Sequence, residues 1–200
     1  MMKFSKTPLG LQTQIDTFRS KLDGFEREHG TIEDSSNDRY YLFYLYFLLN
    51  DSKSSAEYIK WYEKHFPTDI GEPFQLLCWT LMIHRMGLDA DSLLARTMLS
   101  NIYLIPRLLG QPGSGSNIWH AITFEESEYL DSFPEEITAA INDDDRYWIE
   151  KNYNSKEYQD ALARYIDIDT KIKTLPDGKE RTKLVNESCH LTDSFKKTIL

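Results

Sequence analysis

The chain has 200 residues, of which 32 are acidic and 23 basic, so that its formal net charge is −9. Aromatic residues make up 13% of it and there are nine glycines and seven prolines, a composition that excludes a disordered chain. Two cysteines are too few for a disulfide scaffold or a cysteine-rich zinc module. The acidic balance excludes a general nucleic-acid backbone binder, which needs clustered cations.

The length suits a single domain over residues 1–200. The most apolar run, Tyr40–Leu49, falls well short of the roughly 20 residues that cross a bilayer. Met1–Gln14 has no apolar stretch of signal-peptide length. We therefore expect a cytoplasmic chain without a membrane span, with signal-less secretion as the alternative.

The part of the chain before Glu72 shows the spacing of three helices. One carries apolar residues from Leu11 to Phe25 and ends at Gly30. The second covers about Asp38 to Leu49, and because it is apolar on most faces we expect it to be central. The third is marked by Ala56, Ile59, Tyr62 and Phe66 and ends at Pro67.

Two more helices are predicted before residue 110. Glu72 and Pro73 open the first, with Pro in the first turn, and it runs to Gly87. Asp89 or Asp91 caps the second, which carries apolar residues from Leu93 to Ile105 and is kinked or ended by Pro106.

The second half is also helical but more polar. Residues 111–117 lie in the glycine-rich stretch and are expected to form a flexible loop. Helical patterns follow over about 124–141, with Pro134 as a break, then after Asp143–Asp145, over 155–172 and over 179–200. No run alternates with period two, so the predicted fold class is all-α.

The chain contains a repeat signal, which appears when the sequence is shifted against itself by about 34 residues, the helix–turn–helix period typical of tetratricopeptide repeats. This shift aligns Asp38–Leu49 with Glu72–Ile83, and eight of the twelve pairs are apolar in both copies. We therefore predict two stacked antiparallel helical hairpins over 38–110 and a C-terminal helical extension over 118–200, with an unrelated helical bundle as the alternative.

A family resemblance rests on three motifs. They are Leu93-Leu94-Ala95-Arg96, the run Asn101 to Gly110 with its Leu108-Leu109-Gly110 ending, and the pair Glu126-Ser127-Glu128-Tyr129-Leu130 and Tyr147-Trp148-Ile149. The first two resemble a hairpin of bacterial tetratricopeptide-like proteins, and the pair resembles the sequence that follows this hairpin in those proteins. The resemblance covers about residues 38–150. The chain departs from that pattern by Ile102 where the family has Pro and Ile149 where it has Leu. The resemblance implies a helical repeat fold and a binding role, and no catalytic residues.

No arrangement of residues predicts a catalytic centre, a cofactor or a metal site. The five histidines include no helical metal pair, and Cys78 reads as a core residue. Asp143–Asp145 reads as a solvated helix N-terminus, and Asp167-x-Asp169 as an exposed helix face. The glycines at 113 and 115 lack the strand that a phosphate-binding loop requires.

Aromatic residues are the candidate binding residues, since Tyr and Trp are favoured at interface hot spots. Four tyrosines spread around one helix and cannot all point inward, and Trp119 with His120 could line a pocket after the glycine-rich loop. The candidates are Tyr40, Tyr41, Tyr44, Tyr46, Trp119 and His120.

We therefore expect a non-enzymatic protein–protein interaction module, an adaptor or regulator with an acidic, tyrosine-rich helical surface. One alternative is an acidic inhibitor, such as an immunity or antitoxin protein that neutralises a basic toxin. A second alternative is an enzyme with a pocket near His120. The expected partner is another protein, basic in the inhibitor case, and not a nucleic acid.

Overall fold

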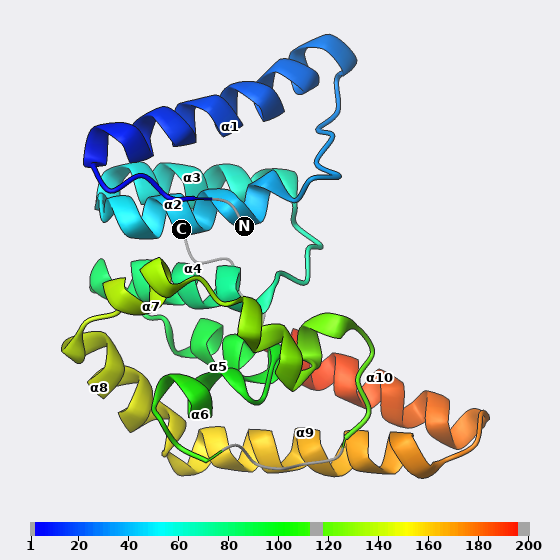
Figure 1. Cartoon of the computed structure of the whole chain (residues 1–200). Helices are drawn as coiled ribbons and strands as arrows, with labels where there is room; N and C mark the ends of the chain where they lie inside the picture. The colour runs from blue at the N-terminus through cyan, green and yellow to red at the C-terminus, as the bar shows by residue number, and fades with distance from the viewer. Residues whose placement is uncertain (1–2, 113–117, 196–200) are drawn as a thin grey trace. The chain divides into compact units, whose positions relative to one another are not determined.

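A computed structural model describes residues 3–112 and 118–195, and every regular element in these ranges is a helix (Figure 1). The predicted all-α fold is confirmed. The described residues fall into two compact units: unit 1 has 3–88 and 134–140, and unit 2 has 89–112, 118–133 and 141–195. Most of the glycine-rich stretch expected to be a flexible loop, residues 113–117, lies outside the described ranges.

Unit 1 is built around one helix, α2(Asp38–Leu49), which has eight buried residues among its twelve. It contacts the four other helices of the unit, which are α1(Pro8–His29), α3(Ser52–His65), α4(Pro73–Arg85) and α7(Glu135–Ala140). In Figure 1, α2 and α3 lie between α1 and α4. The expectation that the helix over 38–49 is central to the core is confirmed.

The ends of these helices follow from local chemistry. Gly30 ends α1 in a left-handed conformation (φ 70°), which glycine adopts without a steric penalty. Glu72 begins α4: its carboxylate accepts the N–H groups of Phe74 and Gln75, and Pro73 occupies the first turn as predicted.

Unit 2 has α9(Lys156–Thr174) as its longest helix, in contact with α5(Asp91–Ser100), α8(Asp143–Tyr153) and α10(Lys179–Asp193). Three short elements complete it: α6(Leu104–Leu108), η1(Thr123–Glu125) and η2(Ser127–Ser132). Within the described residues, no helix combines the length and the apolar character needed to cross a membrane.

Two predicted helices are wrong in extent. The helix expected from Leu93 to Ile105 ends at Ser100, because Asn101 is extended (φ −157°, ψ 106°) and its side-chain oxygen accepts the N–H of Tyr103. Pro106, the expected breaker, lies inside α6. The region 124–141, expected to be helical with a break at Pro134, has the two short 3₁₀ helices η1 and η2 before Pro134 and α7 after it.

The two helical hairpins expected over 38–110 differ in their spacing. Helices α2 and α4 begin at positions 38 and 73, and helices α3 and α5 begin at positions 52 and 91. The interval is longer for the second pair, because the loop from α4 to α5 is longer than the two-residue loop from α2 to α3. One constant offset therefore does not relate both pairs of helix starts.

Candidate functional site

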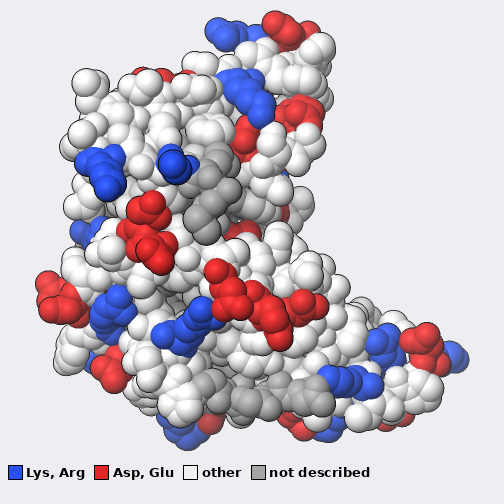
Figure 2. Space-filling view, in the orientation of Figure 1, with Lys and Arg blue, Asp and Glu red and all other residues white. Residues whose placement is uncertain are grey.

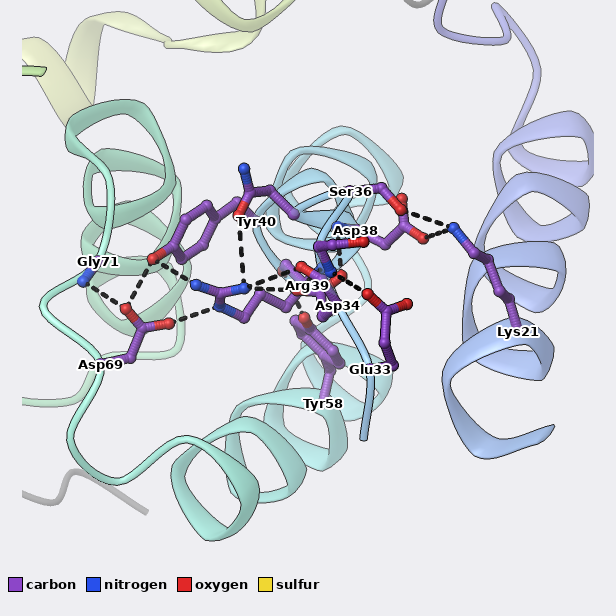
Figure 3. A network of polar contacts seen from close by, with 12 residues as sticks. Lys21, Glu33, Asp34, Ser36, Asp38, Arg39, Tyr40, Tyr58, Asp69 and Gly71 are labelled. Atoms are coloured by element: carbon purple, nitrogen blue, oxygen red, sulfur yellow. Dashed lines mark hydrogen bonds and ion pairs between the residues drawn. The ribbon is translucent and has the colours of Figure 1, made fainter. Parts of the chain in front are cut away.

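The N-terminus of α2 carries a network of polar side chains (Figure 3). The carboxylate of Asp34 accepts the N–H of Asp38 at 2.6 Å and that of Arg39 at 3.2 Å. Asp34 therefore satisfies the first N–H groups of the helix in place of the N-cap residue Asn37, which is left-handed (φ 58°) and makes no side-chain cap bond.

Arg39 joins this helix end to the loop before α4. Its Nη1 donates to Asp34 Oδ2 at 2.7 Å and its Nε donates to Asp69 Oδ2 at 2.6 Å. Burial acts to lower the pKa of Arg39, but the hydrogen bonds that it donates to both carboxylates outweigh burial and raise that pKa. Burial likewise acts to raise the pKa of Asp69, whereas its bonds to Tyr40, Gly71 and Arg39 lower it overall.

Three further side chains extend the network. Tyr40 Oη donates to Asp69 Oδ1 at 2.6 Å and accepts from Arg39 Nη2 at 2.9 Å. Tyr58 Oη, on α3, donates to the backbone carbonyl of Arg39 at 2.5 Å, and Lys21 Nζ, on α1, lies 2.5 Å from Asp38 Oδ2. The network thus ties α1, α2, α3 and the loop before α4 together.

A surface cavity of about 350 Å³ lies beside this network in unit 1, lined by Asp34, Arg39, His65, Phe66, Pro67, Thr68 and Asp69. Both carboxylates in its lining already pair with the guanidinium of Arg39. Because these charges are mutually satisfied, the arrangement fixes the helix end in place and offers neither a free nucleophile nor a free carboxylate base.

The structure places the four predicted tyrosines in and around the core of unit 1. Tyr40, Tyr41 and Tyr46 are 8% exposed or less, because four helices cover α2. Tyr44 is half-buried and donates its hydroxyl to Glu72 Oε2 at 2.6 Å. Three of these tyrosines are therefore core residues, and the contact surface expected from the group stays a prediction.

Trp119 and His120 lie in unit 2, just before η1. The N–H of Trp119 donates to the backbone carbonyl of Asp169 at 3.2 Å, and the Arg181 guanidinium is 5.4 Å from its ring. His120 is half-buried, and burial lowers the pKa of its imidazole, which is therefore neutral at pH 7. A catalytic pocket at His120 stays a prediction.

Unit 2 also holds a buried carboxylate, that of Asp169, although the motif Asp167-x-Asp169 predicted an exposed helix face. Asp169 is 1% exposed, and among the described residues its Oδ1 has no hydrogen-bond partner. Burial raises the pKa of Asp169 to about 6, although the hydroxyls of Ser188 and Tyr165 counteract the shift. Burial also raises the pKa of Glu125, and Asp169 adds to that shift. The other member of the motif, Asp167, pairs with Arg164 and Lys171 at the surface.

A second cavity, which lies in unit 2 and has a volume of about 390 Å³, has an acidic lining. It involves the start of α5, the end of α8 and the start of α9. Its lining includes three carboxylates, from Asp89, Asp91 and Glu157, and no Lys, Arg or His. Tyr158 also lines the cavity, and burial is the main cause of its raised pKa. All three carboxylates raise that pKa further.

The excess of negative over positive charge in the chain comes from one segment. Residues 108–145, here called the acidic segment, contain nine Asp and Glu and no Lys or Arg. The remainder contains 23 acidic and 23 basic residues, so the whole net charge of −9 comes from this segment. In unit 2, Figure 2 shows acidic side chains gathered over the stretch with η1 and η2. The acidic runs Glu125–Glu128 and Asp143–Asp145 are local sequence patterns, whereas the absence of Lys and Arg is a property of the whole segment.

Within residues 3–112 and 118–195, no group of three or more His, Cys, Asp or Glu side chains is arranged to hold a metal ion. The chain matches no protein-family model, no curated protein and no solved structure. Its function is therefore inferred from its own residues.

Proposed function

We propose that the protein is a non-enzymatic interaction module that binds a basic protein partner through the acidic segment. The observation that carries the proposal is the confinement of the whole net charge of −9 to residues 108–145. An excess of negative charge of this kind attracts a positively charged partner, speeds its association and discriminates against acidic proteins.

The exposure of the segment supports the proposal. Glu128, Glu135, Asp143 and Asp144 are exposed, so their charges are accessible to a partner. The acidic cavity lined by Asp89, Asp91 and Glu157 adds negative potential to unit 2 outside the segment.

We extend the proposal to the architecture: α2 to α5 form two stacked hairpins of the tetratricopeptide type. The two-residue loop between α2 and α3 and the contact of α2 with α4 support it, whereas the helix starts depart from a strict period. An experimental structure in which residues 38–65 and 72–100 fail to superpose as helical hairpins would reject this extension.

The test of the binding proposal uses a fluorescent nonaarginine peptide as the basic probe. Its Kd for the full chain is measured by fluorescence anisotropy at about 20 mM and about 200 mM salt, because screening weakens exposed charge interactions. We expect tight binding at low salt and a marked loss at high salt.

Two triple variants with the same net charge of −6 provide the control. E128Q/E135Q/D144N removes three exposed charges inside the acidic segment, and E28Q/E57Q/E180Q removes three exposed charges outside it. We expect the first to weaken binding at least about fivefold more than the second. Equal losses in the two variants would overturn the proposal.

An acidic inhibitor of a basic toxin is the second candidate, and the same charge separation favours it. The inhibitor differs from an adaptor in having one cognate basic partner whose activity it blocks. Retention of that activity in the presence of saturating protein would exclude the inhibitor and leave the adaptor.

A further inference from the structure

One helix that begins in the acidic segment presents a face that is both charged and aromatic. We propose that the outward face of α8, formed by Asp143, Asp144, Tyr147 and Glu150 and here called the α8 face, binds an arginine-rich segment of the partner protein. This inference rests on the proposed function, since it names the surface and the chemistry of the basic partner.

Helical spacing places these four residues together. Asp143, Tyr147 and Glu150 follow at intervals of four and three residues, and Asp144 precedes Tyr147 by three, so all lie on one side of the helix. All four are exposed, and the side chain of Tyr147 is 70% exposed. Ile149 and Tyr153, which are buried, fix the opposite side against the unit.

Only one of the three consecutive aspartates in the first turn of α8 takes part in its capping box. Asn142 accepts the N–H of Asp145 at 2.8 Å, and Asp145 accepts the N–H of Asn142 at 3.0 Å, which completes a capping box. Asp145 is buried in this role. Asp143 and Asp144 take no part in the box and are exposed to solvent.

The positive end of the helix dipole stabilises Asp143 and Asp144 in the first turn, but no side chain in the described ranges pairs with the carboxylates of the α8 face. Among the described residues, the side chains of Asp143, Asp144 and Glu150 have no ion-pair or hydrogen-bond partner. Acidic residues on α9 are paired instead, as Asp160 is with Lys156 and Asp167 is with Lys171. Like charges left unpaired on one face repel each other, and a bound cation would relieve that repulsion.

The chemistry of the face fits arginine. A guanidinium binds carboxylates through paired hydrogen bonds and also stacks on an aromatic ring, and the α8 face offers both kinds of group side by side. On the same helix, the Nη1 of Arg146 donates to the carbonyl of Leu108 at 2.8 Å. Lys151, in the last turn, complements the C-terminal end of the helix dipole.

The test titrates the full ¹⁵N-labelled chain with nonaarginine and follows the amide resonances. We expect the largest shifts in residues 143–151. The Y147A variant should raise the Kd about two- to fivefold, the range of an exposed cation–π contact, whereas Y147F should bind as the parent chain does. The control L9A removes an exposed side chain of unit 1 and should leave the Kd unchanged.

A charge-matched pair completes the experiment. D143N/E150Q should weaken nonaarginine binding more than E28Q/E180Q, and nonalysine should bind the parent chain more weakly than nonaarginine. Salt-dependent binding that ignores Y147A and D143N/E150Q, or shifts that fall outside 143–151, would overturn the α8 face while leaving the proposed function intact. Absence of salt-dependent binding would overturn both.

Discussion

At the scale of single residues, Arg39 is the side chain on which the polar network of unit 1 depends. Its guanidinium compensates two largely buried carboxylates, those of Asp34 and Asp69. The substitution Arg39→Met keeps much of the apolar stem of the side chain but removes the guanidinium that pairs with both carboxylates. We expect a loss of about 2–4 kcal/mol in the free energy of unfolding, measured by urea denaturation.

The control for this prediction is Arg39→Lys, which keeps the charge but cannot reach both carboxylates with fixed geometry. The free energy of unfolding of this variant should lie between those of the parent chain and the Met variant. A loss below about 0.5 kcal/mol for Arg39→Met would show that the network contributes little to stability.

Asp169 gives a pH dependence with a defined sign. Burial raises its pKa to about 6, against about 3.9 for an unfolded chain. Between these values the folded state binds more protons than the unfolded state, so stability falls as pH rises from about 4 to 6. We expect Asp169→Asn to be more stable than the parent chain at pH 7, by about 1–3 kcal/mol, because the amide carries no charge to bury.

Urea unfolding at pH 4, 5, 6 and 7 checks this prediction. The difference between Asp169→Asn and the parent chain should grow with pH, whereas the exposed control Glu180→Gln should show no such trend. A constant difference from pH 4 to 7 would contradict a raised pKa in the folded protein.

At the scale of elements, Asn101 decides where α5 ends. It is buried, its Oδ1 accepts the N–H of Tyr103 at 3.0 Å, and its Nδ2 donates to the carbonyls of Phe124 and Glu126 at 2.7 and 3.0 Å. Asn101→Ala leaves these buried groups unsatisfied, and we expect it to cost about 1–3 kcal/mol.

The measurement combines urea denaturation with amide hydrogen exchange. Protection should fall at Tyr103, whose N–H loses its acceptor, while protection in α2 of unit 1 stays the same. A variant that keeps both its stability and its protection at Tyr103 would show that backbone preference alone ends the helix.

The elements that periodicity predicted well are those in which local and tertiary forces agree. Residues 38–49 were predictable from their apolar composition, and the start at Pro73 from the capping residue Glu72 and the proline that follows it. The break at Asn101 depends on the carbonyls of Phe124 and Glu126, which lie far along the chain and belong to no local pattern. The part of 124–141 before Pro134 was mispredicted, because two 3₁₀ helices use apolar spacing that is typical of an α-helix.

Tertiary packing also decides which features of the candidate site could be predicted. Exposure of Tyr147 and the unpaired state of Asp143 depend on which faces other helices cover, so neither follows from the sequence. The sequence does not predict the burial of Asp169 either, because the spacing of Asp167 and Asp169 is typical of a solvated helix face. The separation of charge, by contrast, is written entirely in the residue types of 108–145.

At the scale of the whole molecule, the division into two units predicts how perturbations combine. Arg39 belongs to unit 1 and Asp169 to unit 2. Sites without shared partners have additive effects within about 0.5 kcal/mol. We therefore expect the double variant Arg39→Met/Asp169→Asn to show the sum of the two single changes by urea denaturation. A coupling above about 1 kcal/mol would contradict independent units.

The absence of Lys and Arg from the acidic segment has a practical consequence for laboratory chemistry. Trypsin cuts after Lys and Arg, so between Arg107 and Arg146 it finds no cleavage site, and a digest releases residues 108–146 as one long fragment. Amine-reactive cross-linkers have no lysine to attack there. A carbodiimide would capture a bound partner, because it joins the carboxylates of the acidic segment to the lysines of the partner.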